Sequence, residues 1–443
     1  MGYLKKLFFL SGMLLPAFSS FSQWSRPVEQ LKEYCKATTA TGYSSRLGLL
    51  TLVPGRNLHY LFPFYHAFHD EAKFIKVYSE KGYYDELSQY FAFAEDYQTA
   101  LQYLVKSYDS VDDATRRKVF KMAEKVENIE HVDARLYINF AAKTRKVVMI
   151  NEAYDKPLHR AFVLSLLPGL YRQGYRYLAM EMLDNFSNHS LSKLNLHTGY
   201  YTSEPVAGEL VRSALALGFT LVSYEDTAAS KHTVNQRDSI QAENIYEVLR
   251  KDTAARILVY AAGAHISKKA GADGYVPMGL AFRRISGIDP LTIDQTDMTE
   301  ESNFGYGRVI YQAYLQKYPL TVASIARIDN IPVNAFNNDL YDLSVIHPPT
   351  MYKDGRPTWL SLGGTRQPTF IKPTAPNVFL VQAYYEREVV ENDNTPWQLV
   401  PADQTYIPGG KKNYLLYLKK GKYRVYFRDI NYQILGTLNV EVN

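Results

Sequence analysis

The sequence predicts an α/β fold: a mostly parallel sheet flanked by helices, with an N-terminal helical region and a small C-terminal antiparallel β module. Two observations predict it. Between about residues 141 and 372, short apolar runs rich in β-branched residues alternate with longer segments whose apolar residues recur every three or four positions. From about residue 373, apolar residues alternate with other residues at period two, which is typical of antiparallel strands.

Residues 1–22 have the pattern of a secretory signal peptide. Lys5 and Lys6 precede an apolar stretch from Leu7 to Phe18, and Ser20-Phe21-Ser22 forms a small-x-small cleavage site. We therefore expect an exported protein, periplasmic or secreted, with a cleavable signal. A membrane anchor is the alternative, although the apolar run is shorter than the roughly 20 residues that a spanning helix needs. No later stretch is apolar enough to cross a bilayer, so we expect no span after signal removal.

Composition limits the partners and the cross-links. The chain has 443 residues, which predicts two or three domains, and a net charge of +5 that is spread without a basic block. No nucleic-acid partner is therefore expected. Cys35 is the single cysteine, which excludes an internal disulfide. The oligomeric state is left open.

Residues 23–140 are predicted to be mostly helical. The segment from Tyr83 to Tyr108 has the character of one helical-repeat unit, and a solenoid needs about three copies, so we interpret the region as a helical cap on the next domain. Three histidines lie in its aromatic-rich stretch. A metal site is one interpretation, and packing or surface roles are the favoured one, for His59, His66 and His69.

The α/β domain, predicted over 141–372, opens with a strand–helix–strand unit. Val147–Ile150 has the length and β-branched content of a buried strand. Pro157 suits the first turn of a helix whose apolar face runs to Leu170, which we expect Pro168-Gly169 to kink or shorten. The second strand, Tyr177–Met180, follows. The two strands lead into Glu152 and Glu181, at the edge where open parallel sheets bind ligands.

The alternation then continues. A helix capped by Ser203-Glu204-Pro205 precedes a strand at 219–224, and a helix over about 240–249 precedes a strand at 256–260. A helix at 309–315 and strands at 320–325 and 343–346 complete the domain. These strands add three polar side chains to the same predicted edge: Glu225, His265 and His347.

The module predicted over 373–443 is sandwich-like. Its strands are expected around 378–384, 414–418, 423–427 and 434–440, with Lys420-Gly421 as a hairpin turn. Trp397 and the tyrosines of this region fit core packing better than sugar binding.

The stretch from Asn151 to Arg160 resembles the ChaN/erythromycin-esterase/Tiki superfamily. The ChaN branch carries Gly-Glu-x-His-Asp-x-Pro-x-His-His here, which Glu152, Asp155, Pro157 and His159 match. Residues 237–245 are similar to the Arg-Asp-x-x-Met-Ala-x-Asn helix of the erythromycin-esterase branch. Residues 259–266 are similar to its strand ending in Ala-His-Asn-x-His, with His265 as the final histidine, and Met278-Gly279 also matches. The resemblance covers roughly residues 145 to 290.

The sequence departs from the family pattern at three positions. Tyr154 replaces the first histidine of Glu-x-His, and Ala262 and Gly263 replace the His-Asn of the later motif. The resemblance implies ester hydrolysis, haem or iron uptake, or metal-dependent peptide cleavage, depending on the branch. It therefore implies a site rather than a reaction.

A hydrolytic hypothesis assigns water activation to Glu152 with His265, while Glu181 orients or protonates. Arg160 or Arg237 would hold an anionic intermediate. His159 either faces the cleft as a catalytic group or only caps its helix. Substrate contacts are expected from the remaining polar residues of the edge: Tyr154, Arg160, Arg237, Glu225 and His347. The alternative is that Glu152 and Glu181 form structural salt bridges with Arg160 and Arg237.

Two functions are therefore carried forward. The first is an exported hydrolase acting on an ester or amide. The second is a non-catalytic protein that binds haem, a metal or a cell-envelope ligand in a degenerate site. Glu152, Glu181, His159 and His265 form a mixed set suited to zinc or manganese, but without the Glu-x-His pair we predict no metal. Tyr154 is a candidate ferric-haem ligand. The cofactor is left open.

Overall fold

The computed structural model describes residues 18–38, 59–185, 191–271, 273–302, 306–334, 339–391, 398–406 and 413–443. Residues 1–17 of the predicted signal peptide and Trp397 lie outside these ranges. None of the described helices combines the length and apolar character needed to cross a membrane.

Helices dominate the N-terminal part of the chain, as predicted. They are α1 (Phe18–Ala37), α2 (Phe62–His69), α3 (Glu71–Phe93), α4 (Tyr97–Ser107) and α5 (Asp113–Glu124). One buried cluster joins Phe64 and Phe91 of this region to Val148 and Ile150 of the first predicted strand. Two of the three histidines have clear packing contacts, because His59 stacks on Tyr432 and His69 bonds the carbonyl of Cys35.

The centre of the molecule is a nine-stranded, mainly parallel sheet, which confirms the predicted fold class. Its strand order is β1-β7-β9-β6-β2-β5-β3-β4, with β8 paired to β7. Strands β9, β6, β2, β5, β3 and β4 run parallel, and β7 and β1 are antiparallel additions. The bounds are β1 Glu130–Asp133, β2 Val147–Glu152, β3 Tyr177–Met180, β4 Thr220–Val222, β5 Ile257–Ala262, β6 Leu291–Met298, β7 Ser324–Ile328, β8 Ile331–Pro332 and β9 Leu343–Ile346.

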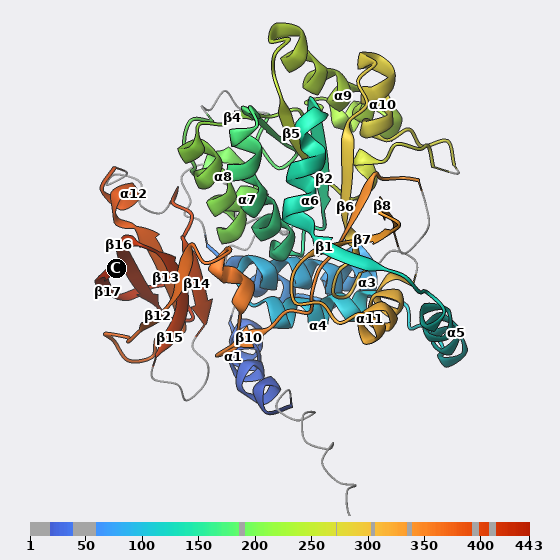
Figure 1. The fold of residues 1–443 in the computed structure, drawn as a ribbon. Coiled ribbons are helices and arrows are strands. Elements are labelled where there is room, and N and C mark those ends of the chain that lie inside the picture. Colours follow the sequence, from blue (N-terminus) through green and yellow to red (C-terminus); the bar gives the residue numbers. More distant parts are fainter. Residues whose placement is uncertain are drawn as a thin grey trace, which may run out of the picture.

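Both faces of the sheet are covered by helices (Figure 1). Successive side chains of a strand point to opposite faces, so the side chains of β2 pack into two hydrophobic cores, one on each face of the sheet. Val148 and Ile150 pack with α6 (Ala134–Ala141), α7 (Pro157–Arg172) and α8 (Pro205–Leu217). Val147 and Met149 pack with α9 (Val234–Lys251) and α10 (Met278–Ser286). Because helices cover both faces of β2, its residues form a continuous apolar run and do not alternate with polar residues.

Three expectations about these elements need correction. The central strand β6 was not predicted, because Thr292, Asp294 and Gln295 interrupt its apolar pattern. The strand expected at 320–325 lies at Ser324–Ile328 and is antiparallel to β9. Pro168 does not shorten α7, which continues to Arg172.

The C-terminal strands form two facing antiparallel sheets, as the sandwich-like prediction requires. One pairs β12 (Arg366–Ile371) with β15 (Tyr414–Lys419), and the other has the order β14-β13-β16-β17. The bounds are β13 Leu380–Tyr385, β14 Asp403–Tyr406, β16 Gly421–Arg428 and β17 Ile434–Val442. Because β12 begins at Arg366, this pairing starts before residue 373.

The predicted hairpin at Lys420-Gly421 is wrong. β15 pairs with β12, whereas β16 pairs with β13 and β17, so the chain crosses from one sheet to the other at this turn. Leu416 of β15 and Val425 of β16 lie in the same buried cluster. Two alternating strands that face one core from opposite sides have the same sequence pattern as a hairpin.

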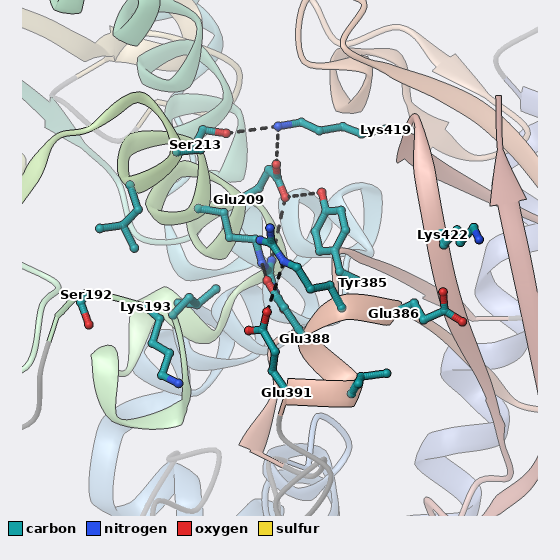
Figure 2. A pocket seen from close by; sticks show the side chains of 16 residues that line it. Ser192, Lys193, Glu209, Ser213, Tyr385, Glu386, Glu388, Glu391, Lys419 and Lys422 are labelled. Carbon is teal, nitrogen blue, oxygen red and sulfur yellow. Dashed lines mark hydrogen bonds and ion pairs between the residues drawn. The ribbon is translucent and has the colours of Figure 1, made fainter.

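The β module is joined to the sheet domain through Glu209 of α8 (Figure 2). Glu209 accepts hydrogen bonds from Lys419 Nζ at 2.5 Å and from the Tyr385 hydroxyl at 2.9 Å, and Arg366 Nη2 lies 3.2 Å from its Oε2. Arg212 of α8 also donates to Glu388 of α12 (Glu386–Glu391) at 2.6 Å. All of these groups except Arg366 border a cavity of about 940 Å³ between the two parts.

Glu209→Gln should destabilise the protein in a pH-dependent way. Burial alone would raise the pKa of Glu209, but Arg366, Lys419 and Arg212 hold it at about 2. A carboxylate with a pKa below its unfolded value stabilises the fold above that value, and this contribution is lost as the pH falls through the folded pKa. We expect a loss of about 3 kcal/mol at pH 7 and about half of that at pH 3, measured by urea unfolding.

Glu391→Gln is the matched control, since Glu391 borders the same cavity and its side chain is 53% exposed. A Glu209→Gln loss that is below about 1 kcal/mol at pH 7, within the range of a surface ion pair, would contradict this role.

Candidate functional site

The carboxyl ends of β2, β5 and β6 open onto a cavity of about 560 Å³. Its wall contains acidic and aromatic side chains, including Glu152, Tyr154, Asp155, Tyr275, Asp297 and Tyr341. This is the edge at which parallel sheets place ligands, so the cavity lies where the sequence predicts the site.

Glu152, the last residue of β2, is buried and held from one side. Its Oε2 accepts hydrogen bonds from Arg160 Nε at 2.9 Å and from the Tyr260 hydroxyl at 3.0 Å. Its Oε1 has no hydrogen-bond partner in the described part of the chain, and the residue lines the cavity. Burial raises the pKa of Glu152, and the opposing effects of Arg160 and Tyr260 do not cancel it.

Arg160, near the start of α7, is fully buried and fully engaged. Besides Glu152 it donates to Glu204 Oε2 at 3.0 Å and to the carbonyl of Tyr154 at 2.9 Å. Glu204 in turn caps α8 by accepting from the backbone N–H groups of Val206 and Ala207. Arg160 is not among the residues that line the cavity, so the structure does not place it where it would hold substrate or an anionic intermediate.

Glu181, after β3, is engaged with Arg237 of α9. Arg237 Nη2 donates to Glu181 Oε1 at 2.9 Å and Arg237 Nε donates to Glu225 Oε1 at 2.9 Å. Glu225 also accepts from Gln241 at 3.0 Å. The salt-bridge alternative thus describes the Glu181–Arg237–Glu225 cluster, and neither Arg237 nor Glu225 lines the cavity.

The two carboxylates are not on adjacent strands. β5 lies between β2 and β3, so the strands bearing Glu152 and Glu181 are about 10 Å apart. Glu152 is in register with Ala262 of β5, whose N–H donates to Glu181 Oε2 at 2.7 Å. The negative charge of Glu181 still contributes to the raised pKa of Glu152. The two groups therefore flank one strand end.

His265 stands beside that strand end, on the short 3-10 helix η5 (Gly263–Ile266). Its Nδ1 lies 2.9 Å from Asp238 Oδ2, and its Nε2 lies 3.9 Å from Glu181 Oε1. Tyr275, which lines the cavity, donates its hydroxyl to the same Asp238 oxygen at 2.7 Å. Burial would lower the pKa of His265, but the hydrogen bond that it donates to Asp238 and the charge of Glu181 raise it above 6.5.

Asp238 is a site residue that the sequence analysis did not assign. It follows Arg237 in the Arg-Asp motif, and its position on α9 was the available signal. Its Oδ2 also accepts the N–H of Met278 at 2.9 Å, which ties α10 to α9. Gly279 allows α10 to approach η5 closely, since a Cβ at this position would lie 2.5 Å from the carbonyl oxygen of Ile266. The two motifs of the resemblance therefore meet around His265.

His159 and His347 lie in the interior and do not line the cavity. Their rings are 5.4 Å apart, and both side chains are almost fully buried. His159 Nδ1 accepts the N–H of Ala153 at 3.1 Å, and His347 Nε2 lies 3.2 Å from Gln295 Oε1. Burial lowers the pKa of both imidazoles, that of His347 to about 3. The structure therefore does not place His159 for the expected catalytic role, nor His347 for the expected substrate contact.

The proposed metal and haem ligands do not form a common site. Within the described ranges, no group of three or more His, Cys, Asp or Glu side chains is arranged to hold a metal ion. His159 is buried away from His265, and β5 separates Glu152 from Glu181. Tyr154 lies on the cavity wall with its ring stacked on Tyr201, at a centroid distance of 4.2 Å.

Comparison with known proteins gives little. No family model matches the chain, and no curated protein matches it. One similar solved structure is described as RRSP, a MARTX toxin effector domain from Vibrio vulnificus CMCP6, with 14% identity, a TM-score of 0.29 and coverage of 52% of this chain and 46% of that one. Another, described as bacterial protein toxins, has 15% identity, a TM-score of 0.29 and coverage of 64% and 57%. The chain thus spans about half the length of each of these proteins, and TM-scores this low support no inference about its function.

The environment of His265 predicts a pH-dependent contribution to stability. A group whose folded pKa is raised stabilises the fold below its unfolded pKa, here about 6.5, and loses that contribution as the pH rises through the folded pKa. His265→Gln should therefore cost more unfolding free energy at pH 5.5 than at pH 9. Denaturant unfolding at both pH values measures this. An equal cost, or a larger cost at pH 9, would contradict the Asp238–His265 arrangement.

Proposed function

We propose that this protein is a hydrolase that cleaves an ester or amide in the cavity at the ends of β2, β5 and β6, using water activated by Glu152. The observation that carries the proposal is the orientation of Glu152: one carboxylate oxygen is held by Arg160 and Tyr260, and the other, beside the cavity, has no hydrogen-bond partner among the residues that the structure describes.

The environment of Glu152 supports its role as the general base. Burial raises the pKa of its carboxyl group, and a base works best when its pKa approaches the working pH. The two hydrogen bonds to Oε2 fix the rotamer, so Oε1 meets a bound water in one geometry.

His265 does not itself line the cavity, but it lies on the same 3-10 helix as Gly263 and Ala264, which do, and its charge supports the reaction from this position. Asp238 fixes its ring through Nδ1, and the raised pKa keeps part of the imidazole protonated near neutral pH. The positive charge of a protonated imidazole at this strand end favours a developing oxyanion in the cavity. Arg160 and Arg237 are engaged by carboxylates, whereas Lys156 and Lys269 line the cavity and add positive charge there.

A binding protein is the second candidate, and the wall of the cavity favours it. Tyr154, Tyr275 and Tyr341 offer aromatic surfaces with hydroxyl groups, which suit a small-molecule or cell-envelope ligand. The signal-like N-terminus supports a ligand or substrate met outside the cytoplasm in either case.

Glu152→Gln separates the two candidates. Removal of the base should lower kcat/KM by roughly 10²- to 10⁴-fold on a panel of esters and amides, while the fold persists. Steady-state rates and the thermal midpoint are the measurements. Glu243→Gln, on the exposed face of α9 and paired with Arg250, is the control and should keep full activity. Unchanged rates in Glu152→Gln would refute the assigned base, and an unmodified protein that hydrolyses none of the panel would leave the binding function.

A further inference from the structure

Asp297, at the end of β6, faces the same cavity as Glu152 and is not used by the proposed mechanism so far. The residue is 6% exposed and lines the cavity. Its carboxyl group has no hydrogen bond or ion pair within the described part of the chain, whereas the neighbouring Asp294 is surrounded by donors. A buried carboxyl group without a protein partner is costly unless it is protonated or meets a ligand.

The position of Asp297 relative to Glu152 is fixed by Asn151. Asn151 precedes Glu152 on β2, and its Nδ2 donates to Asp294 Oδ1 at 2.8 Å while its Oδ1 accepts the N–H of Gln295 at 2.8 Å. Asp294 Oδ2 then accepts the N–H of Asp297 at 3.2 Å. This chain of contacts ties the end of β6 to the end of β2, on the side opposite β5.

The backbone of β6 is irregular at this point. Asp294 pairs with Ser344 and Met298 pairs with Ile346 of β9, so the three residues 295–297 of β6 lie opposite the single residue 345 of its partner. Such a bulge removes residues from the ladder and re-aims their side chains, and bulges are common beside active sites. Here the bulge contains Asp297 and leaves its side chain on the cavity wall.

The surroundings of Asp297 keep it protonated near neutral pH. Burial, followed by the charge of Asp294, raises the pKa of Asp297 to about 8. A neutral carboxyl group is a proton donor, and two carboxyl groups with different environments can divide acid and base roles.

We propose that Asp297 is the general acid of the hydrolysis and protonates the leaving group. This inference rests on the proposed function. Water adds to the acyl carbon as Glu152 takes one of its protons. The bond from that carbon to the leaving oxygen or nitrogen then breaks, its electron pair stays on the leaving atom, and that atom takes the proton of Asp297. The products are a carboxylic acid and an alcohol or amine, and solvent moves the proton from Glu152 back to Asp297.

Leaving-group dependence tests the assignment. The probes are a 4-nitrophenyl ester and an alkyl ester of the same acid, because 4-nitrophenolate leaves without protonation. Asp297→Asn should lower kcat/KM at least 100-fold on the alkyl ester and less than about 10-fold on the 4-nitrophenyl ester. Asp297→Glu, which restores a proton, should recover part of the alkyl-ester activity. Glu243→Gln should change neither.

Each outcome decides the matter. Equal losses on the two esters, or no loss, would overturn the proton-donor role and leave Glu152 as base intact. If the unmodified protein hydrolyses neither ester nor an amide, the proposed function fails, and this inference fails with it. If Asp297→Asn does not fold, the test uses a series of esters and the unmodified protein. A proton-donating Asp297 predicts that log kcat/KM depends only weakly on the pKa of the leaving group. A steep dependence would overturn it.

Discussion

The buried guanidinium of Arg160 is the interaction on which the rest of the site depends. It joins Glu152 at the end of β2, Glu204 at the start of α8 and the carbonyl of Tyr154. A lone buried charge would be strongly destabilising, and two carboxylates and a carbonyl satisfy this one. The same contacts set the direction of Glu152, because they occupy one of its oxygens and leave the other beside the cavity.

Arg160 and Arg237 both form ion pairs with carboxylates, which limits the groups that can act in catalysis. Arg160 and Arg237 neutralise carboxylates, so positive charge near the substrate comes from Lys156 and Lys269 on the cavity wall and from His265 behind it, whose ring is fixed by Asp238. Salt bridge and functional site are therefore not exclusive interpretations of the cluster. Glu181 and Glu225 belong to the structural part, whereas Glu152 is held by an ion pair and still faces open space.

Local sequence patterns predicted the elements whose environment is simple. Val147–Ile150 and Leu343–Ile346 are buried on both faces and have the expected apolar runs. β6 was missed because its buried polar residues are satisfied by partners far along the chain, as Asp294 is by Asn151. For the same reason Asp297 could not be assigned to the site from the sequence. Local sequence patterns also do not predict the order of the strands in the sheet. Because β5 lies between β2 and β3, Glu152 and Glu181 are not on adjacent strands.

The spacing of residues in the sequence likewise does not predict that His159 and His347 are buried, since a helix position near a strand end can face either the cleft or the core. Their lowered pKa values reflect that burial. The residues that define the edge thus divide into a buried framework and a smaller group around the cavity.

The most direct test of this account is the titration of the Glu152 carboxyl group itself, followed by carbon NMR of protein labelled at glutamate and assigned with Glu152→Gln. An oriented base in a buried cavity predicts a pKa above the ordinary 4.5 of glutamate. A pKa below 4.5, as a purely structural ion pair with Arg160 would give, would contradict the account.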